Sequence, residues 1–372
     1  MARVAIAMSG GVDSSVAAVL LCEQGHEVLG LHMKLYNGAD QGRQRKRCCS
    51  LDEALDARGI CRKLDIPFYV LDFQKEFRET VVDYFIRQYH EGKTPNPCVM
   101  CNRKIKSRLL IQRALELECD YLATGHYAAI RKDSCNGHHQ LVKPSDSRKD
   151  QTYFLHGLAS EDLPRMIFPL SGFKKEDVRR IASETELVSA QKEDSQEICF
   201  VPQDYRGFLE DQSVRRSPKG RFVDTRGKDL GEHRGLMYYT VGQRRGLGIS
   251  DETPYYVARL DCGRNRVILG KKEDLYAGGV EVVEMNWVSC PPRLDPFYAN
   301  IKLRYSHRES RARIIPQNEK SVRAILKAPV SSVSPGQAAV IYENDVVLGG
   351  GWINTVAPAQ KTESSSVFEN IA

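Results

Sequence analysis

Short apolar runs alternate with amphipathic stretches over the first half of the chain. The apolar runs are rich in β-branched and aromatic residues and predict strands at 4–8, 27–36, 67–73 and 120–127. Stretches with helical spacing predict helices at 16–21, 51–64, 75–89, 102–116 and 174–186. Because strands alternate with helices, we expect an α/β fold whose open, mostly parallel sheet is covered on both faces.

The pattern changes after Pro202. Residues 203–278 are rich in glycine and arginine and contain short apolar runs such as 221–224, which predicts a small central domain of mixed structure. From residue 279 to 358, two-residue alternation separated by turns predicts an all-β module, most simply a small β-barrel. Its strands are expected at 280–288, 297–305, 311–316, 321–326, 338–343 and 346–352.

Two more segments complete the division of the chain. Residues 1–202 form the predicted N-terminal domain, and within it 128–147 reads as a polar hairpin with an Asn136-Gly137 turn. Residues 359–372 are polar and serine-rich, which is typical of a disordered tail.

The turn after the first predicted strand has the sequence S-G-G-V-D-S-S, from Ser9 to Ser15. A strand, a Gly-Gly turn and a helix N-terminus place unpaired backbone N–H groups around an anion. The glycines allow close approach of the backbone, and three hydroxyl groups add hydrogen-bond donors. A plain strand-to-helix turn would not need the whole string, so the sequence predicts phosphate binding here.

The absence of other phosphate motifs narrows the chemistry. Neither G-x-x-x-x-G-K-[ST] nor G-x-G-x-x-G occurs, and no lysine stands in the loop itself. The string resembles the pyrophosphatase loop (PP-loop) of enzymes that split ATP between its α- and β-phosphates. That resemblance implies adenylation of a substrate oxygen with release of pyrophosphate, and Asp13 would help to hold magnesium or the pyrophosphate.

A second candidate region is T-P-N-P-C-V-M-C-N-R-K at 94–104. Its two prolines predict that 94–98 stays outside a helix that begins near Asn102. Cys98 and Cys101 are three residues apart, so they can share one face of the first turn. The helix dipole and nearby cations favour a thiolate, so we expect Cys101 to be acidic and nucleophilic rather than a buried structural cysteine.

Other candidates follow from position. Met33 ends the second predicted strand and is either a neighbour of an adenine ring or core filler. Gly125 and His126 end the fourth strand, where glycine would let the backbone approach the nucleotide and the histidine is catalytic or structural. Cys199 lies in a predicted loop at 187–200, and Cys48-Cys49 lacks the usual spacing of metal ligands.

Composition limits the class of protein. The net charge of +6 permits a polyanionic partner without requiring one. No apolar run approaches the roughly 18 residues that span a membrane, and the first strand begins where a signal peptide would lie. Eleven cysteines, an odd number, are scattered along the chain and favour reduced thiols. We therefore expect a cytoplasmic enzyme that does not bind membranes.

Several motifs in a fixed order make the resemblance specific. They are N-P-C-V-M-C-N, A-T-G-H-Y, D-S-Q-E-I-C-F, G-L-M-Y-Y-T-V-G-Q-R-R-G-L-G and P-G-Q. Together they resemble the bacterial and mitochondrial tRNA-specific 2-thiouridylases over about residues 2–355. The resemblance implies a Rossmann-like PP-loop domain, a small central domain and a C-terminal β-barrel.

The implied reaction is ATP-dependent 2-thiolation of the wobble uridine, at position 34, of tRNAs for lysine, glutamate and glutamine. ATP and Mg²⁺ would adenylate the C2 oxygen of the uridine. A sulfur-relay protein or cysteine desulfurase would load Cys199 as a persulfide whose terminal sulfur reaches C2. Cys101 would be the nucleophile that attacks the persulfide, forming a transient disulfide with Cys199.

The resemblance also assigns residues to sites. ATP would bind Ala7, Met8, Ser9, Gly10, Gly11, Val12, Asp13, Ser14, Met33 and Gly125. The target base would meet Asn96, Pro97 and Cys98, and His126 would shape the active site. The tRNA would contact Arg148, Lys149, Asp150, Arg304, Tyr305 and Gln337, where arginine and lysine suit phosphates and tyrosine suits stacking on a base.

Cys98 departs from the family pattern, which has an aspartate at this position. That aspartate is the proposed general acid or base, and a thiol is a poor substitute for it. Cys98, Cys101 and Cys199 are alternatively three ligands of a 4Fe–4S cluster that binds sulfide. A non-catalytic RNA-binding protein and a PP-loop amidotransferase-type ligase are further alternatives.

Overall fold

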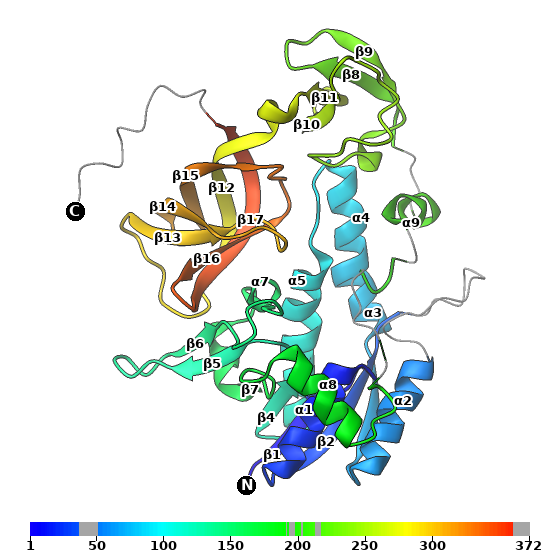
Figure 1. Ribbon diagram of the computed structural model, residues 1–372, viewed down its shortest axis with the longest axis vertical. Coiled ribbons are helices and arrows are strands. Elements are labelled where there is room, and N and C mark those ends of the chain that lie inside the picture. Colours follow the sequence, from blue (N-terminus) through cyan, green and yellow to red (C-terminus); the bar gives the residue numbers. More distant parts are fainter. Residues whose placement is uncertain (37–50, 191, 193–197, 202–203, 213–216, 360–372) are drawn as a thin grey trace.

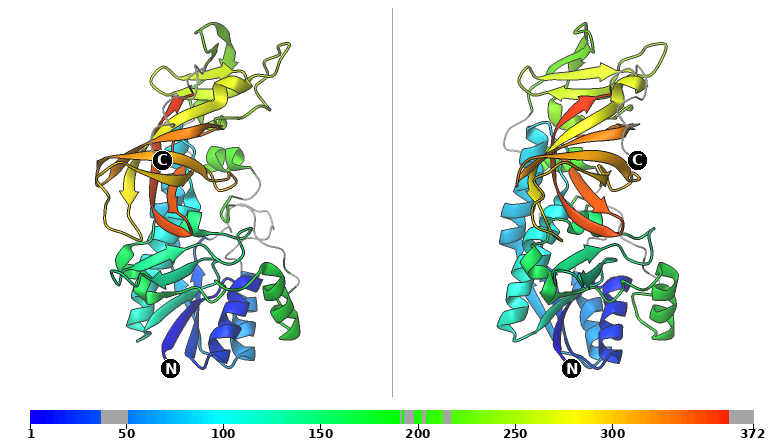
Figure 2. Two further views of the ribbon diagram at one scale, coloured as in Figure 1. Left: turned by 60° about the vertical axis from the view of Figure 1, so that its left-hand side comes forward. Right: turned by 90° about the vertical axis from the view of Figure 1, so that its left-hand side faces the viewer.

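The computed structural model describes residues 1–36, 51–190, 192, 198–201, 204–212 and 217–359. An α/β domain lies at one end of the long axis, a small sheet at the other end, and a barrel to one side between them (Figures 1 and 2). The helix labelled α4 runs from the α/β domain toward the small sheet (Figure 1). The predicted mixed α/β architecture with a C-terminal barrel is confirmed.

The N-terminal sheet is parallel and has the strand order β3-β2-β1-β4-β7. Its strands are β1 (Arg3–Ala7), β2 (Glu27–Lys34), β3 (Phe68–Asp72), β4 (Tyr121–Thr124) and β7 (Met166–Ile167). The chain fills one side of β1 with β2 and β3 and then crosses to β4 on its other side. The turn after β1 therefore lies at the topological switch point, where open α/β sheets bind their ligands.

Alternate residues of β1 face two different cores. Val4 and Ile6 join a cluster with helices α1 (Val12–Glu23), α2 (Leu51–Lys63) and α8 (Lys175–Glu184). Ala5 faces the opposite cluster, which contains α3 (Gln74–Phe77), the π-helical segment η2 (Arg78–Val82), α4 (Asp83–His90) and α6 (Leu110–Glu116). Helices thus cover both faces of the sheet, as the near-continuous apolar strands predicted.

The helix predicted to begin near Asn102 begins earlier. It runs as α5 (Pro97–Cys101), η3 (Asn102–Leu109) and α6, and η3 is a π-helical stretch. Pro97 occupies the first helical position, where proline needs no N–H partner, and Asn96 caps the helix by accepting a hydrogen bond from the Val99 backbone N–H at 3.4 Å. The prediction that 94–98 lies outside the helix holds for 94–96 and is wrong for Pro97 and Cys98, because Pro97 starts the helix instead of preventing it.

The two β modules follow. The small sheet has the order β10-β11-β8-β9, with β8 (Gly220–Asp224), β9 (Asp229–His233), β10 (Tyr256–Asp261) and β11 (Arg266–Gly270). The barrel has the order β12-β15-β14-β13-β16-β17 and closes through pairing of β12 with β17. Its strands are β12 (Tyr276–Asn286), β13 (Phe297–Lys302), β14 (Ser310–Asn318), β15 (Ser321–Ser331), β16 (Ala338–Glu343) and β17 (Val346–Pro358).

The predicted hairpin joins the N-terminal domain to the barrel. Its strands β5 (Ala129–Lys132) and β6 (His139–Val142) extend the barrel sheet through pairing of Val142 with Val346. The Leu141 backbone N–H donates to Ser289 Oγ at 2.8 Å. The remaining helical elements are α7 (Thr152–Leu155), η4 (Ser160–Arg165), α9 (Tyr205–Gln212), η5 (Leu236–Tyr238) and η6 (Lys272–Leu275).

Two predictions from the sequence concern segments that the structure does not describe. The Cys48-Cys49 pair and the tail from residue 360 lie outside the described residues. Among the residues that are described, no helix is both long and apolar enough to cross a membrane.

Candidate active site

The predicted phosphate loop joins β1 to α1. Gly10 has φ +75°, and a Cβ there would lie 2.5 Å from the Glu53 carbonyl oxygen, so only glycine is compatible with this turn. The hydroxyl groups of Ser14 and Ser15 donate to the Gly11 carbonyl oxygen at 3.1 and 2.7 Å. The loop is therefore held in shape by its own side chains before any ligand binds.

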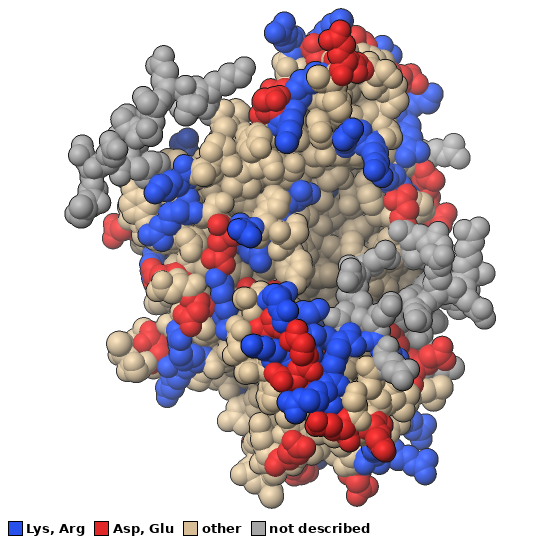
Figure 3. Space-filling view, viewed as in Figure 1, with Lys and Arg blue, Asp and Glu red and all other residues tan. Residues whose placement is uncertain are grey.

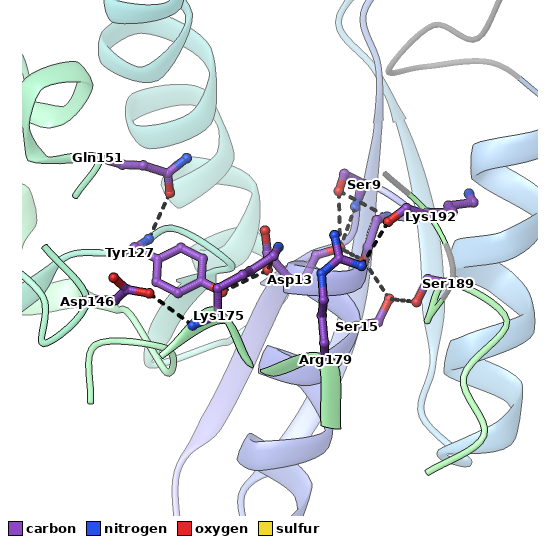
Figure 4. A network of polar contacts seen from close by, with 12 residues as sticks. Ser9, Asp13, Ser15, Tyr127, Asp146, Gln151, Lys175, Arg179, Ser189 and Lys192 are labelled. Atoms are coloured by element: carbon purple, nitrogen blue, oxygen red, sulfur yellow. Dashed lines mark hydrogen bonds and ion pairs between the residues drawn. The ribbon is translucent and has the colours of Figure 1, made fainter. Parts of the chain in front are cut away.

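Asp13 lies in the first turn of α1 and is held by two residues distant in sequence (Figure 4). Lys175 Nζ, at the start of α8, donates to Asp13 Oδ1 at 2.6 Å. The Tyr127 hydroxyl donates to the same oxygen at 3.0 Å. The Asp13 side chain is 32% exposed and that of Lys175 only 9%, so the carboxylate faces the solvent side of the pair.

A second lysine reaches the loop from the far side (Figure 4). Lys192 Nζ donates to the Gly10 carbonyl oxygen at 3.0 Å and forms an ion pair with Asp56 of α2. Two further contacts attach the same segment, from Ser189 Oγ to Ser15 Oγ and from Arg179 of α8 to the Lys192 carbonyl oxygen. No local pattern predicts the contact of either lysine with the loop, because both lysines stand over 160 residues beyond Asp13.

Other residues proposed for the nucleotide serve the fold around the loop. A Cβ on Gly125 would lie 2.7 Å from the Ser14 backbone nitrogen, so this glycine allows β4 to approach the N-terminus of α1. Met8 and Val12 are buried, and both belong to the core cluster that contains residues of α1. Met33 is 9% exposed and belongs to the opposite core cluster, and Ala7 packs against that cluster.

His126 lies at the carboxyl end of β4 beside the loop. Its Nδ1 is 2.8 Å from Thr124 Oγ1, and its ring meets Phe168 edge to face. Burial, with a smaller effect of Lys106, lowers the pKa of His126 to about 3. The imidazole is therefore neutral at physiological pH.

Asn96, Pro97 and Cys98 form the start of α5. Asn96 is 7% exposed and its side chain is the helix cap, so it organises the turn more than it faces solvent. Pro97 is also buried, whereas Cys98 is half-buried. Of the three residues predicted to meet a target base, Cys98 offers the most accessible side chain.

The structure does not support an acidic Cys101. The residue lies in the second turn of the helix, not at its N-terminus, and is 5% exposed. Burial raises the pKa of the Cys101 thiol to about 11, against a smaller opposite effect of Lys106. The prediction fails because the helix begins at Pro97, which carries Cys101 inward.

Cys199 packs against the same apolar cluster that contains Cys101. The Cys101 thiol is free. Within the described ranges, no three side chains of His, Cys, Asp or Glu are grouped so that they would hold a metal ion. Cys98, Cys101 and Cys199 are thus not gathered into a cluster site in this conformation.

The residues predicted to contact tRNA have different surroundings. Arg148 is exposed but bonds Glu176 at 2.8 Å and Asp146 at 3.3 Å. Asp150 is 7% exposed, and its Oδ1 accepts hydrogen bonds from the backbone N–H and the hydroxyl of Thr152. Asp150 therefore has a structural role. Lys149 is half-buried between them.

The other predicted tRNA residues lie where the barrel meets the N-terminal domain. Tyr305 is 41% exposed, and its ring centroid is 4.5 Å from that of Phe154. Arg304 is half-buried, and burial lowers the pKa of its guanidinium. Gln337 Nε2 donates to the carbonyl oxygens of Thr94 and Pro95, so it connects the barrel to the segment that leads into α5.

The surface between these elements is hollowed. Figure 3 shows a concave region between the small sheet and the N-terminal domain, with a floor formed mainly by uncharged residues. Lysine and arginine side chains, interspersed with acidic ones, gather below it over α8 (Figures 1 and 3). A hollow bordered by cations suits a large polyanionic ligand.

Known family models match the three structural parts. Residues 2–203 match the tRNA methyl transferase HUP domain, 206–271 the tRNA methyl transferase PRC-barrel domain, and 278–353 the aminomethyltransferase beta-barrel domain. The fold and the loop thus define a PP-loop nucleotide-binding protein with two appended β domains. The names of the models refer to methyl transfer, whereas the curated relatives are named for thiolation.

Those relatives are similar over nearly their whole length. A tRNA-specific 2-thiouridylase MnmA of Symbiobacterium thermophilum is 46% identical over 94% of this chain and 92% of its own. One from Chloroflexus aggregans is 47% identical over 95% of this chain and 98% of its own. A third, from Geotalea uraniireducens, is 46% identical over 94% of both chains. The chain belongs to the tRNA-specific 2-thiouridylase family.

Proposed function

We propose that this chain catalyses the ATP-dependent 2-thiolation of uridine 34 of tRNA. The observation that carries the proposal is the combination of a preformed PP-loop with two cysteines at one apolar cluster, which contains Cys101 and against which Cys199 packs. Membership of the 2-thiouridylase family supports it. Methyl transfer, which the names of the family models mention, would use neither feature.

The first half-reaction is adenylation. The uridine C2 oxygen attacks the α-phosphorus of ATP, the bond to the β-phosphate breaks, and pyrophosphate leaves. Backbone N–H groups of the loop and of the α1 N-terminus receive the phosphates. His126, which is neutral, is a hydrogen-bonding group beside the loop.

Mg²⁺ would neutralise phosphate charge during this step. Asp13 fits a role as its ligand, because Lys175 and Tyr127 both bind Oδ1 and the carboxylate is partly exposed. Magnesium is commonly held by one or two carboxylates together with substrate phosphates.

The second half-reaction transfers sulfur. The terminal sulfur of a Cys199 persulfide attacks C2 of the adenylated uridine, and AMP leaves with the former C2 oxygen. The Cys101 thiolate then attacks Sγ of Cys199. The bond between this Sγ and the sulfur on C2 breaks, and 2-thiouridine is released. Reduction of the resulting Cys101–Cys199 disulfide by a dithiol restores both thiols.

Cys101 is not ready for this step in the present conformation. With a pKa raised to about 11, its thiol is protonated at neutral pH. A change that exposes it must precede the attack on the persulfide. The helix start at Pro97–Cys98, where the target base would bind, is one turn away from Cys101.

The partners follow from this scheme. The polyanionic substrate is a tRNA with a wobble uridine, with the lysine, glutamate and glutamine tRNAs as proposed members, contacted by Lys149, Arg304 and Tyr305. A sulfur-relay protein or a cysteine desulfurase would supply the persulfide. Both reactants are cytoplasmic, which is the compartment we propose for the enzyme.

The test separates the two half-reactions. We expect Cys199→Ser to keep tRNA-dependent pyrophosphate release but to form no thiouridine, and Asp13→Ala to lose both. Pyrophosphate and thionucleoside are measured in parallel, with Cys135→Ser, an exposed cysteine of the β5–β6 hairpin, as the control. Thiouridine formed by Cys199→Ser would overturn the assignment.

A further inference from the structure

The phosphate loop contains no lysine, yet two lysines reach it in the folded chain (Figure 4). They differ in accessibility. The Lys175 side chain is 9% exposed, and its ammonium group is bound to the Asp13 carboxylate. The Lys192 side chain is 35% exposed. An ammonium group that stays accessible beside a phosphate loop is suited to contact a ligand, and one that is buried against a carboxylate is suited to position it.

The surroundings of Lys192 also indicate that its ammonium group is suited to contact a ligand. Its ammonium group touches the backbone of Gly10, a residue of the loop itself, at 3.0 Å. Its counter-ion, Asp56, is 26% exposed and comes from α2, which is not part of the loop. A partly exposed ion pair contributes little stability, so exchanging one anion for another around this ammonium group costs little.

We propose that Lys192 binds the polyphosphate chain of the nucleotide, and that Asp56 is its counter-ion only while the site is empty. The inference rests on the proposed use of ATP and adds a residue to that site. When ATP binds, phosphate oxygens replace the Asp56 carboxylate at the ammonium group. Lys175 stays on Asp13 and serves as a positioning residue.

This exchange predicts that substitutions of the two members of the ion pair affect ATP affinity differently. Lys192→Met removes a charge-assisted hydrogen bond to phosphate, so ATP affinity falls by about tenfold, while adenosine affinity is unchanged. Asp56→Asn removes the competitor of the phosphate, so ATP affinity stays at the wild-type value or rises. A purely structural ion pair would weaken ATP binding in both variants alike.

The experiment measures the binding of ATP and adenosine to the full-length protein by competition against a fluorescent ATP analogue. Lys63→Met is the matched control, because Lys63 also donates to a carbonyl oxygen, that of Glu186 at 3.1 Å, and pairs with a carboxylate, but at the far end of α2. It should bind both ligands as the wild type does. Lys192→Arg, which keeps the charge, should restore most of the ATP affinity.

Three results would overturn the proposal. They are an unchanged ATP affinity in Lys192→Met, an equal loss of ATP and adenosine affinity in that variant, and a loss in Asp56→Asn as large as that in Lys192→Met. Thermal unfolding without nucleotide shows that each variant is folded. If the wild-type protein itself bound no ATP, the proposed function would fail, and that outcome is distinct from the three above.

Discussion

The side-chain amide of Gln337 donates a hydrogen bond to the main-chain carbonyl oxygen of Thr94 at 3.0 Å. The Thr94 backbone N–H in turn donates to the Pro335 carbonyl oxygen at 2.9 Å. The barrel therefore holds the segment that enters α5, two residues before its Asn96 cap. The family motif P-G-Q, for which the resemblance implied a tRNA contact, has a structural explanation in this contact.

We predict that Gln337→Ala lowers tRNA-dependent pyrophosphate release by about tenfold, because the variant loses two hydrogen bonds that fix the helix start. ATP affinity should not change, since the phosphate loop is a separate element. Gln317→Ala is the control, as Gln317 donates a local hydrogen bond to the Ile315 carbonyl oxygen in the same barrel. Equal activity of Gln337→Ala and the control would contradict this positioning role.

A second prediction concerns the charge of Lys149. Lys149→Glu should weaken tRNA binding and reduce the slope of log affinity against log salt by about one or two ions, because fewer counterions are released. Arg58→Glu, an equal charge change on an exposed residue of α2, should leave the slope near the wild-type value. Identical slopes for Lys149→Glu and the wild type would remove Lys149 from the interface. Arg304 is less suitable for charge reversal, because it is half-buried.

A third prediction concerns the reactivity of Cys101. With a pKa raised by burial to about 11, the thiol has a thiolate fraction on the order of 10⁻⁴ at pH 7. Iodoacetamide should therefore modify Cys101 at least about 100-fold more slowly than the exposed Cys135, and the rate should rise with pH. Addition of tRNA and ATP should speed modification at Cys101 but not at Cys135. Peptide mass spectrometry gives both rates, and comparable rates in the free protein at pH 7 would refute the buried state.

A fourth prediction concerns the buried His156, through which acid should destabilise the fold. The residue is 2% exposed, its Nδ1 bonds the Tyr153 carbonyl oxygen at 2.8 Å, and burial lowers its pKa to about 4. Because its pKa in the unfolded chain is near 6.5, folding favours the neutral form, and that stability is lost as pH falls from 6.5 toward 4. Between pH 7 and 5 the free energy of unfolding should fall by about 2 kcal/mol from this residue.

Urea denaturation at the two pH values tests this prediction. His156→Gln should lose that part of the pH dependence, whereas His138→Gln, at an exposed site on the hairpin, should keep it. A pH dependence that is the same in wild type and His156→Gln would show that another group is responsible.

Local patterns predicted most of the elements, because period and turn residues act over a few positions. The strand at Ala338–Glu343 has the predicted bounds, and the other five strands of the barrel lie where expected, although β12 begins four residues early. The predicted start of α5 is wrong because proline disfavours most helical positions, whereas at the first helical position it is favourable. That one error placed Cys101 at a helix end and led to the wrong pKa direction.

Local sequence patterns do not predict contacts between segments that are distant in the chain. Lys175 and Lys192 reach the phosphate loop only because α8 packs beside α1, and their nearest sequence neighbours show no motif that refers to Asp13 or Gly10. Likewise, the burial of Asp150 against Thr152 depends on the position of the barrel strand that carries Tyr342. A single sequence identifies the residues of the loop, but not the side chains that fold onto it.

The last prediction concerns Cys98, where this chain has a thiol in place of the family aspartate. Cys98 is half-buried at the second position of α5, where a negative charge interacts favourably with the helix dipole, so Cys98→Asp should fold. We expect it to increase the rate of tRNA-dependent pyrophosphate release by several-fold, because a carboxylate is ionised at neutral pH and accepts the proton of the uridine better than a neutral thiol. Cys98→Asn is the matched control without the charge, and it should show no increase.

The same variant distinguishes the persulfide route from the 4Fe–4S alternative. The described cysteines are not grouped as metal ligands, so protein purified without oxygen should thiolate tRNA from a persulfide donor whether or not it contains iron. If the wild-type protein instead holds near-stoichiometric iron and sulfide, and Cys98→Ala loses the iron and the activity together, the cluster carries the reaction. In that case Cys98→Asp would lower the rate, opposite to the effect expected for a restored acid–base group. The sign of one measured change in rate therefore decides what Cys98 contributes to the chemistry of this site.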